Sequence, residues 1–243
     1  MKLSRYKHDS CFSYTLGATL SYELLKTSPE LIRRAYLRPN IKHGDDLIEI
    51  LNKLHQRRIS ITESTKAFNI LNAKDNCLLI VEFTKPSTLL DHDKNQPHIV
   101  LVNPSDAGNL GTIMRTAAAF DYRNIAIITP AVDPYHPKTI RASMGAIFHL
   151  NIALFNTFNE YSQSIINSRR LYSFMLNSDA QTLESTTQPD SNYSLIFGNE
   201  ASGLPSEFAS STKPIYIPQS SNVDSLNLSI AVGIALHHFK NHS

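Results

Sequence analysis

The chain has 243 residues, of which 42% are hydrophobic, and a formal net charge of +2. This length and apolar content allow one large or two small domains with a buried core, which excludes a disordered or fibrous chain. Cys11 and Cys77 show no paired spacing, so neither a disulfide framework nor a zinc ribbon is indicated. No apolar stretch approaches the ~18 residues needed to cross a membrane, and we therefore expect a soluble cytoplasmic protein.

The basic charge is concentrated in the first part of the chain. Residues 1–95 contain 15 Lys and Arg against 11 Asp and Glu, whereas residues 96–243 contain 8 against 10. A basic region of this kind can provide a footprint for a phosphate backbone. The candidate RNA-binding residues here are Arg33, Arg34, Arg38, Arg57 and Arg58. Ordinary surface arginines at solvated helix ends are the alternative interpretation.

Residues 1–90 alternate between helical and strand-like patterns. Leu16, Leu20, Leu24 and Leu25 recur at helical spacing. Further along, the pattern predicts strands at 31–37, 59–61 and 77–83 and helices at 47–54 and 63–71. This alternation is typical of a small α/β domain, which we place at residues 1–90. Prolines, charges and polar residues between two apolar runs predict a linker at 91–97.

Short apolar runs rich in β-branched and aromatic residues follow this linker. We expect strands at 98–102, 124–129, 151–155, 171–176, 193–197 and 214–218, and helices at 109–120, 137–148, 157–168 and 225–239. This alternation predicts an α/β fold whose mostly parallel sheet has helices on both faces. Ligands bind such sheets beyond the carboxyl ends of the strands, so the residues that follow each strand are candidate site residues.

The segment after the strand at 98–102 combines small residues with a conspicuous arginine. Gly108 and Gly111 permit a tight turn and a close approach of backbone amides to a ligand, although any strand-to-helix turn can use glycine. Arg115 stands in an otherwise apolar helix. Its side chain either covers the surface with its aliphatic stem or delivers a permanent charge to a site.

Two further strand ends carry candidate residues. After the strand at 193–197, Gly198 permits close backbone approach and Glu200 places a carboxylate in a loop of small residues. A plain turn is the alternative interpretation there. After the strand at 214–218, Ser225 is a natural N-cap for the final helix. This structural role does not explain Asn227, because asparagine is a mediocre helix former.

Taken together and in this order, these segments resemble the motifs of the SpoU (TrmH-like) RNA ribose methyltransferases of the SPOUT superfamily. The first motif corresponds to Asn109, Gly111 and Arg115. The second corresponds to residues 197–204, and the third to Ile217, Pro218 and residues 225–229. The segment that begins at Arg141 resembles the family's intervening helix. The resemblance covers residues 98–240, and we take 98–243 as the methyltransferase domain.

The resemblance implies an enzyme that uses S-adenosyl-L-methionine to methylate a ribose 2′-hydroxyl in RNA. It also implies a deep trefoil knot at the C-terminal end, a homodimer formed through the methyltransferase domain, and an N-terminal RNA-binding domain similar to certain ribosomal proteins. This domain favours ribosomal RNA over transfer RNA as the substrate. The family's usual turn before the last strand of that domain is replaced by Asp75-Asn76-Cys77. No metal is implied, and the sequence has no His-Glu-x-x-His motif.

The resemblance also assigns candidate roles to individual residues. The catalytic candidates are Arg115, Asn109, Glu200, Ser225 and Asn227. The cofactor-binding candidates are Phe197, Gly198, Asn199, Gly203, Ile217, Pro218, Ser225 and Leu226, and Arg141 joins the RNA-binding candidates. Because arginine is effectively always protonated, we expect Arg115 to stabilise the developing oxyanion and hold a phosphate rather than to remove the proton. A transfer RNA 2′-O-methyltransferase and an RNA-binding protein that keeps the fold without activity are the alternatives.

Overall fold

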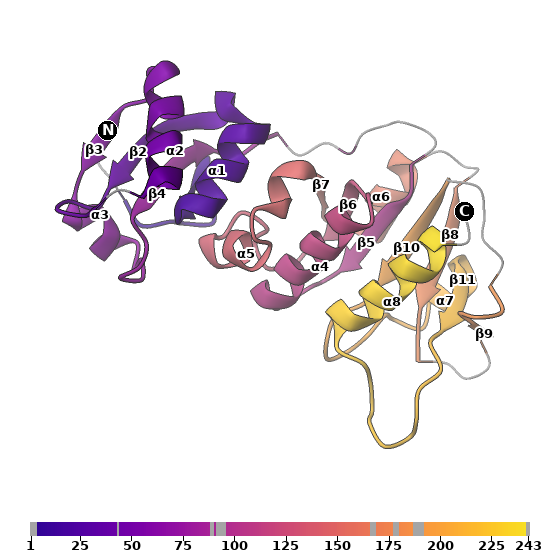
Figure 1. The fold of residues 1–243 in the computed structure, drawn as a ribbon. Coiled ribbons are helices and arrows are strands. Elements are labelled where there is room, and N and C mark those ends of the chain that lie inside the picture. Colours follow the sequence, from indigo (N-terminus) through magenta and orange to yellow (C-terminus); the bar gives the residue numbers. More distant parts are fainter. Residues whose placement is uncertain are drawn as a thin grey trace. The chain divides into compact units, whose positions relative to one another are not determined.

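The computed structural model, drawn in Figure 1, describes residues 4–42, 44–87, 90, 96–165, 169–176, 180–186 and 192–241. The chain divides into two compact units. Unit 1 comprises residues 1–87 and 133–148, and unit 2 comprises residues 88–132 and 149–243. Residues 133–148, which the sequence pattern assigns to the second domain, therefore pack with the N-terminal part of the chain. Most of the predicted linker, residues 91–95, lies outside the described residues.

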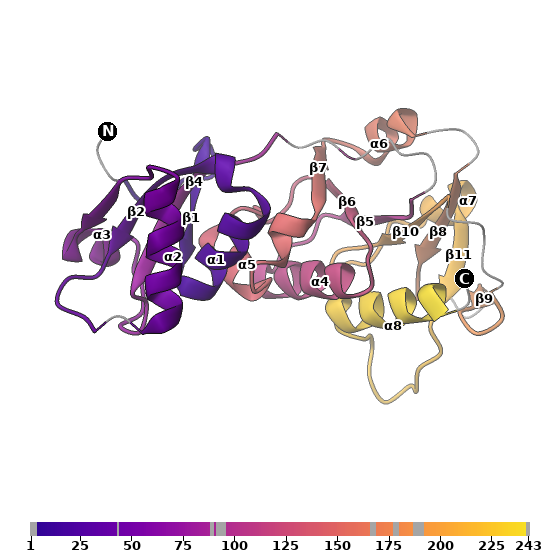
Figure 2. The ribbon, with the colours of Figure 1, turned by 45° about the horizontal axis from the view of Figure 1, so that its top comes forward.

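Unit 1 is built on a four-stranded mixed sheet with the strand order β1-β4-β2-β3. β4 runs antiparallel to β1 and β2, whereas β2 and β3 are parallel. α1 and α2 lie side by side over the sheet (Figure 2), and Phe68 of α3 packs with Tyr14, Tyr36 and Ile80. The elements are β1 (Phe12–Leu16), α1 (Ala18–Thr27), η1 (Pro29–Leu31), β2 (Ile32–Leu37), α2 (Asp45–Gln56), β3 (Ile61–Glu63), α3 (Thr65–Ile70), β4 (Leu79–Thr84) and α5 (Pro137–Ala142).

The predicted alternation in this region is confirmed, with one strand added. β2, β4, α2 and α3 match their predicted positions within a few residues. β1 is missing from the predictions because the helical spacing of leucines extends back to Leu16. Gly17, with a φ of 126°, separates this strand from α1. A positive φ of this kind favours glycine, so the chain changes direction where the leucine spacing alone suggests a continuous helix.

Unit 2 contains a seven-stranded sheet with the strand order β7-β6-β5-β10-β8-β11-β9, in which every pairing is parallel. The predicted parallel sheet is therefore confirmed. β9 and α7 are missing from the predictions because segments of 2 and 4 residues are too short to show a periodicity. The elements are β5 (His98–Val102), α4 (Ala107–Ala119), β6 (Asn124–Ile128), β7 (Asn151–Phe155), α6 (Phe158–Ser164), β8 (Arg170–Phe174), β9 (Gln181–Thr182), β10 (Tyr193–Phe197), α7 (Phe208–Ser211), β11 (Lys213–Tyr216) and α8 (Leu228–Asn241).

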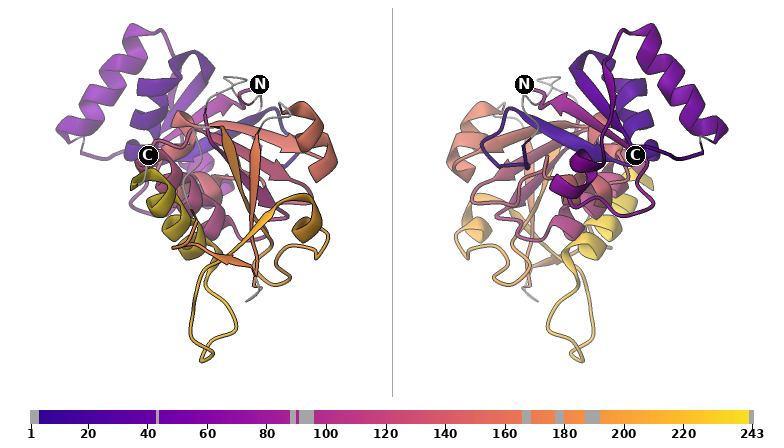
Figure 3. Two further views of the ribbon diagram at one scale, coloured as in Figure 1. Left: turned by 90° about the vertical axis from the view of Figure 1, so that its right-hand side faces the viewer. Right: turned by 90° about the vertical axis from the view of Figure 1, so that its left-hand side faces the viewer.

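Helices cover both faces of the seven-stranded sheet, as predicted (Figure 3). On one face, Val100 and Ile196 pack with Tyr161 of α6 and Phe208 of α7. On the other face, α4 and α8 lie side by side, and Phe239 of α8 contacts the sheet. Every residue of β5, β6 and β10 is buried, as expected for central strands covered on two sides.

The final helix begins later than predicted. α8 starts at Leu228, and Asn227 rather than Ser225 precedes its first turn. The Oδ1 atom of Asn227 accepts a hydrogen bond from the N–H of Ser229, at 2.9 Å. Asparagine is a favourable residue at this position because its side-chain oxygen satisfies a free backbone donor. The N-cap prediction for Ser225 was therefore wrong, and the asparagine that seemed out of place in a helix is its cap.

Two other helices are shorter than predicted. The helix predicted at 137–148 is observed as α5, which ends at Ala142 because the chain turns at Met144 and Gly145, with φ values of 52° and 85°. A short 3-10 helix, η2 (Ala146–His149), follows this turn. The helix predicted at 157–168 is observed as α6, and residues 166–168 lie outside the described part of the chain.

Candidate active site

The neighbouring strands β5 and β10 continue to opposite faces of the seven-stranded sheet. β5 leads into α4 on one face, and β10 leads into α7 on the other. Their carboxyl ends therefore form a topological switch point, the place where open α/β sheets bind ligands. The turn after β5 comprises residues 103–106, and the turn after β10 comprises residues 198–207.

The carboxylate of Glu200 joins these two turns. Its Oε2 atom accepts hydrogen bonds from the N–H and the hydroxyl of Ser105, at 3.0 and 2.7 Å. Its Oε1 atom accepts from the N–H of Asp106 at 3.2 Å and from Nδ2 of Asn109 at 3.3 Å. The free N–H groups at the start of a helix favour an anion at this position. Glu200 thus holds the turn after β10 against the first turn of α4.

These contacts keep the Glu200 carboxylate ionised. Partial burial raises the pKa of Glu200, but hydrogen bonds from Ser105 and Asn109 outweigh this effect and hold the pKa below its ordinary value. A carboxylate with a lowered pKa and both oxygens occupied is a weak proton acceptor. The geometry therefore favours a positioning role for Glu200.

The same network reaches the segment before α8. Oδ1 of Asn109 accepts a hydrogen bond from Nδ2 of Asn227, at 3.0 Å. Oδ1 of Asn227 accepts in turn from the N–H and the hydroxyl of Ser229, at 2.9 and 2.7 Å. One chain of hydrogen bonds thus connects Glu200, Asn109 and Asn227, and each side-chain amide uses both its donor and its acceptor in it.

The turn after β10 is shaped by close backbone contacts. A Cβ atom at Gly198 would lie 2.2 Å from the backbone carbon of Gly203, so only glycine fits there. Nδ2 of Asn199 donates to the carbonyl oxygen of Asn103 at 2.8 Å, and its Oδ1 atom accepts from the N–H of Ala201 at 2.9 Å. Asn199 therefore forms a second connection between the turns after β5 and β10.

A pocket of about 360 Å³ adjoins this network in unit 2. Its apolar lining includes Phe174 and Phe197, whose rings stack with a centroid distance of 4.4 Å. Its polar lining includes Asn199, Glu200 and Ser225. Apolar walls with a few polar groups are typical of sites for small organic molecules.

The predicted site residues fall into three places. Phe197, Gly198, Asn199, Glu200, Gly203, Ile217, Ser225 and Leu226 line the pocket, whereas Pro218 does not. Asn109 and Asn227 lie in the adjoining hydrogen-bond network. Arg115 belongs to neither group: it is exposed on α4, it does not line the pocket, and its side chain forms no hydrogen bond or ion pair with the other described residues.

The sequence interpretation missed two residues of the network, Ser105 and Asp106. Both donate a backbone N–H to Glu200, and Asp106 also caps α4 by accepting from the N–H of Asn109 at 2.8 Å. Their position between a buried strand and a helix was the available signal, because such turns need side chains that can cap the helix.

Two of the predicted RNA-binding arginines contact a buried carboxylate in unit 1. Glu82 is only 1% exposed, and its oxygens lie 3.4 Å from Nε of Arg33 and 2.8 Å from Nη2 of Arg34. These ion pairs provide the charge compensation that a buried carboxylate requires. Arg141 lies in α5 and is partly buried.

The other predicted RNA-binding arginines differ in exposure. Arg38 donates to the carbonyl oxygens of Cys77 and Lys74, at 2.9 and 3.1 Å. Arg57 and Arg58 are exposed at the end of α2. Internal contacts thus account for Arg38, whereas the surface position of Arg57 and Arg58 is compatible with a role in RNA binding.

None of the helices in the described ranges is both long and apolar enough to cross a bilayer. No group of three or more His, Cys, Asp and Glu side chains in these ranges is arranged to hold a metal ion.

The fold and the site define an α/β protein with a small-molecule pocket at the switch point of a parallel sheet. Its residues 96–237 match the model of the SpoU rRNA Methylase family, and the chain belongs to that family. The resemblance inferred from the three motifs is therefore confirmed.

Comparisons with individual proteins agree with this membership. The chain is 27% identical over 136 residues to the 23S rRNA (guanosine(2553)-2'-O)-methyltransferase RlmP of Bacillus subtilis, which covers 56% of this chain and 54% of that protein. It is 30% identical over 141 residues to the 23S rRNA (adenosine(1067)-2'-O)-methyltransferase of Streptomyces azureus, covering 57% and 52%. The chain thus spans about half the length of these curated relatives.

A solved structure extends the similarity to both units. The AdoMet-bound rRNA methyltransferase from Sinorhizobium meliloti is 26% identical, with a TM-score of 0.81. The match covers 96% of this chain and 88% of that one. It confirms the α/β class, with a small mixed sheet in one unit and a parallel sheet in the other.

Proposed function

We propose that the protein is an S-adenosyl-L-methionine-dependent methyltransferase that modifies a ribose 2′-hydroxyl of ribosomal RNA. The observation that carries this proposal is the hydrogen-bond network of Glu200, Asn109 and Asn227, because each of these residues comes from a different motif. The relatives from Bacillus subtilis and Streptomyces azureus are 23S rRNA 2'-O-methyltransferases, which supports ribosomal RNA as the substrate. Such a substrate also supports a cytoplasmic location.

The lining of the pocket fits the proposed cofactor. Phe174, Phe197 and Leu226 offer apolar contacts to an adenine ring, whereas Gln219 and Ser225 offer hydrogen bonds to a ribose or an amino-acid group. When bound, this cofactor supplies an electrophilic methyl group on a sulfonium. The related protein from Sinorhizobium meliloti is described as AdoMet-bound, which supports the same ligand here.

Positioning and charge stabilisation are the contributions that we assign to this chain. Glu200 and Asn109 hold the turns after β5 and β10 in fixed positions, and in-line methyl transfer depends strongly on such alignment. Arg115 stabilises the oxyanion that develops as the hydroxyl loses its proton, and it holds the adjacent phosphate. A permanently protonated guanidinium is suited to this role and not to proton removal.

We infer that the active enzyme is a homodimer formed through unit 2. Arg115 is exposed on α4, and α4 packs on α8 where Gly233 approaches Thr116. Beside this contact, Ile230 and Ile234 of α8 are 54% and 39% exposed. A partner subunit that covers this apolar surface would give Arg115 a place in a shared site. Sedimentation of Ile234→Glu tests this, with monomers expected; an unchanged dimer would contradict the assignment of this surface.

We further propose that the C-terminal part of unit 2 forms the deep trefoil knot of its superfamily. Residues 198–204, 217, 225, 226 and 228 line one pocket although β11 lies between the first two segments. A chain that returns to one place in this way is compatible with a threaded loop, a rare exception to unknotted topology. A crystal structure of the protein with its cofactor tests the threading.

We also propose that unit 1 contributes RNA binding, with residues 1–90 as the RNA-binding domain and 98–243 as the methyltransferase domain. Deletion of residues 1–95 is an unsuitable test, because residues 133–148 pack with that segment. The hydroxyl of Ser13, for example, donates to the carbonyl oxygen of Tyr135 at 2.5 Å. Surface substitutions in the full chain are therefore the appropriate variants.

The proposed activity is tested by methyl transfer to deproteinised RNA. The full chain is incubated with S-adenosylmethionine labelled in the methyl group and with ribosomal or transfer RNA, and 2′-O-methyl positions are then mapped. We expect label on a ribose of ribosomal RNA. Transfer to transfer RNA alone would replace the substrate, and cofactor-independent RNA binding without transfer would support an RNA-binding protein that keeps only the fold.

A further inference from the structure

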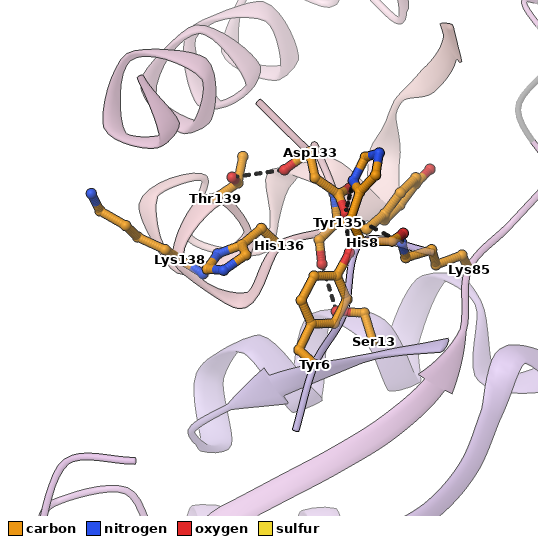
Figure 4. Close-up of polar contacts among 9 residues, drawn as sticks. All are labelled: Tyr6, His8, Ser13, Lys85, Asp133, Tyr135, His136, Lys138 and Thr139. Carbon is orange, nitrogen blue, oxygen red and sulfur yellow. Dashed lines mark hydrogen bonds and ion pairs between the residues drawn. The ribbon is translucent and has the colours of Figure 1, made fainter. Parts of the chain in front are cut away.

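A polar cluster in unit 1 joins the N-terminal segment to residues 133–139 (Figure 4). Asp133 is 8% exposed and accepts hydrogen bonds from the Tyr6 hydroxyl and from the N–H of Tyr135, the latter at 2.8 Å. Nδ1 of His8 lies 3.0 Å from its Oδ2 atom, and Nζ of Lys85 lies 3.3 Å from the same oxygen. The cluster thus anchors the start of the chain to the segment that precedes α5.

The negative charge of this cluster is compensated internally. Burial raises the pKa of Asp133, but the hydrogen bonds from Tyr6 and Tyr135 and the charge of Lys85 outweigh it and lower the pKa. The side chain of Lys85 is only 16% exposed, so this ion pair is largely removed from the surface. The charge that the region presents to solvent therefore comes from other residues.

Those exposed residues are basic or carry an imidazole ring. We define the N-terminal patch as residues 5–8 and 136–138, whose exposed side chains are Arg5, Lys7, His8, His136 and Lys138. Figure 4 places His136 and Lys138 in the same segment, with Tyr6 next to His136. Residues 5–8 and 136–138 contain no acidic residue, and although the exposed Asp9 follows directly, the three cations Arg5, Lys7 and Lys138 leave a surplus of positive charge. An anionic partner is therefore favoured.

The ring of His136 has a defined orientation and protonation. It makes an edge contact with the Tyr6 ring, at a centroid distance of 5.3 Å and an angle of 88°. Its Nδ1 atom accepts a hydrogen bond from the N–H of Lys138 at 3.1 Å, which leaves a proton on Nε2 in the neutral ring. Partial burial lowers the pKa of His136, which favours the neutral ring. The ring therefore offers an uncharged flat surface beside the cationic Lys138.

This combination matches the chemistry of single-stranded RNA. Unpaired bases stack on aromatic or histidine rings, and lysines neutralise the adjacent phosphates. A membrane surface would require exposed apolar side chains that insert into lipid, whereas the exposed side chains of residues 5–8 and 136–138 are all polar or charged. An acidic protein segment could form ion pairs with the lysines, but it would offer no base to stack on the ring of His136.

We propose that the N-terminal patch binds a single-stranded segment of the RNA substrate, with a base on His136 and phosphates at Lys7 and Lys138. This inference rests on the proposed function, since it names the surface that holds the RNA to be methylated. The N-terminal patch is distinct from Arg33, Arg34 and Arg38, which the sequence suggested for RNA binding. These three arginines are used in contacts inside unit 1.

The first test removes the two lysines. Lys7→Ala combined with Lys138→Ala is titrated with a labelled oligouridine of about 20 nucleotides, longer than a typical single-strand site. We expect about tenfold weaker binding and a salt slope smaller by about 1.4, because each lost phosphate contact lowers it by about 0.7. Lys66→Ala combined with Lys74→Ala removes two exposed lysines of the same unit, and an equal loss in this control would overturn the proposal.

The second test removes the ring and keeps the helix cap. His136→Asn retains an oxygen that can accept from the Lys138 N–H, and asparagine is a good capping residue. Loss of one stacked base predicts about tenfold weaker binding of the oligouridine without a change in salt slope. Thermal unfolding of each variant verifies its fold, and equal affinity for a fully paired RNA duplex would overturn the single-strand assignment.

The outcomes distinguish a failure of the patch proposal from a failure of the proposed function. Suppose that the unaltered protein binds RNA and transfers methyl groups, and that both patch variants bind oligouridine with the same affinity as the unaltered protein. The proposal for the patch is then contradicted, and the proposed function stands. If the unaltered protein neither binds RNA nor transfers methyl groups, both proposals fail. Cofactor affinity measured by calorimetry is expected to be the same in all variants, because unit 2 is unaltered.

Discussion

Each unit contains a glutamate whose carboxylate has several bonding partners, but the two carboxylates have different roles. In unit 1, Glu82 is buried and paired with Arg33 and Arg34, so conspicuous charges from neighbouring strands stabilise the interior. In unit 2, Glu200 is held by N–H and hydroxyl donors at the start of α4, next to a pocket. The structural carboxylate of Glu82 thus has cationic partners, whereas the carboxylate of Glu200, which shapes the candidate site, has neutral hydrogen-bond donors. The variants below test this contrast, beginning with the largest expected effect.

Arg115 is the only charged residue of α4, and its side chain is exposed. We expect Arg115→Ala to lower the rate of methyl transfer by about 10³-fold, as the loss of an oxyanion donor does elsewhere. Cofactor affinity should stay within about twofold, since Arg115 does not line the pocket. Transfer of labelled methyl groups and calorimetry measure the two quantities.

Arg123→Ala provides the matched control for this prediction. Arg123 is also exposed in unit 2, but its Nε atom pairs with Asp121 at 3.0 Å. Its removal should leave the transfer rate unchanged. A variant of Arg115 with normal turnover would contradict the catalytic role assigned to it.

Glu82→Gln tests the structural carboxylate of unit 1. Removal of one partner of a buried ion pair leaves the arginines uncompensated, and we expect the free energy of unfolding to fall by about 3 kcal/mol. Urea unfolding measures this change, and Glu63→Gln in β3 is the exposed control. Cofactor affinity should not change; a loss of affinity with unaltered stability would mean that the two carboxylates do not differ in the way described.

Glu200→Gln tests the carboxylate beside the pocket. Glutamine has one acceptor oxygen, so it cannot accept all the hydrogen bonds that the carboxylate accepts from Ser105, Asp106 and Asn109. We expect cofactor binding to weaken by about tenfold, because hydrogen bonds to charged groups contribute about 1.5–3 kcal/mol. Calorimetry measures the affinity, and the exposed Glu207→Gln on the same turn should bind like the unaltered protein.

The unaltered protein and Glu200→Gln are also expected to differ in how their cofactor affinity depends on pH. Because the pKa of Glu200 is lowered in the folded protein, its contribution is complete above the ordinary value of 4.5 and is lost as the pH falls through the lowered pKa. Cofactor affinity of the unaltered protein should therefore fall in acid more steeply than that of Glu200→Gln. Parallel pH profiles would show that the carboxylate does not hold the two turns together.

Arg57→Ala combined with Arg58→Ala is expected to have the smallest effect. These residues are exposed at the end of α2, and their loss removes at most two phosphate contacts. We expect RNA affinity to fall by about threefold with no change in stability. Filter binding measures the RNA affinity, and thermal unfolding measures the stability. A loss of RNA affinity larger than that of the Lys7 and Lys138 variant would make this end of α2 the main RNA-binding surface.

The sequence predicted the parts of the fold that local patterns encode. β5 and β10 were predicted at their observed bounds because buried strands of a parallel sheet are continuous apolar runs. β7 also matches its predicted bounds, although it is an edge strand and only partly buried. β1 was missed because leucines at helical spacing cross Gly17, and β9 because it is too short to show a pattern. For the site, the ordered motifs identified Glu200 and the pocket residues, but not Ser105, whose role depends on a contact with a residue far along the chain.

By itself, the sequence determined the class of fold, the family and the three segments that carry the candidate site, since residue types and spacing are local properties. Only the tertiary structure decided that residues 133–148 pack with unit 1 and that Arg33 and Arg34 compensate Glu82. It likewise decided that Asn227 caps α8 while donating to Asn109. These features arise from hydrogen bonds and ion pairs between residues distant in sequence, which form only when folding brings the partners together and removes them from water.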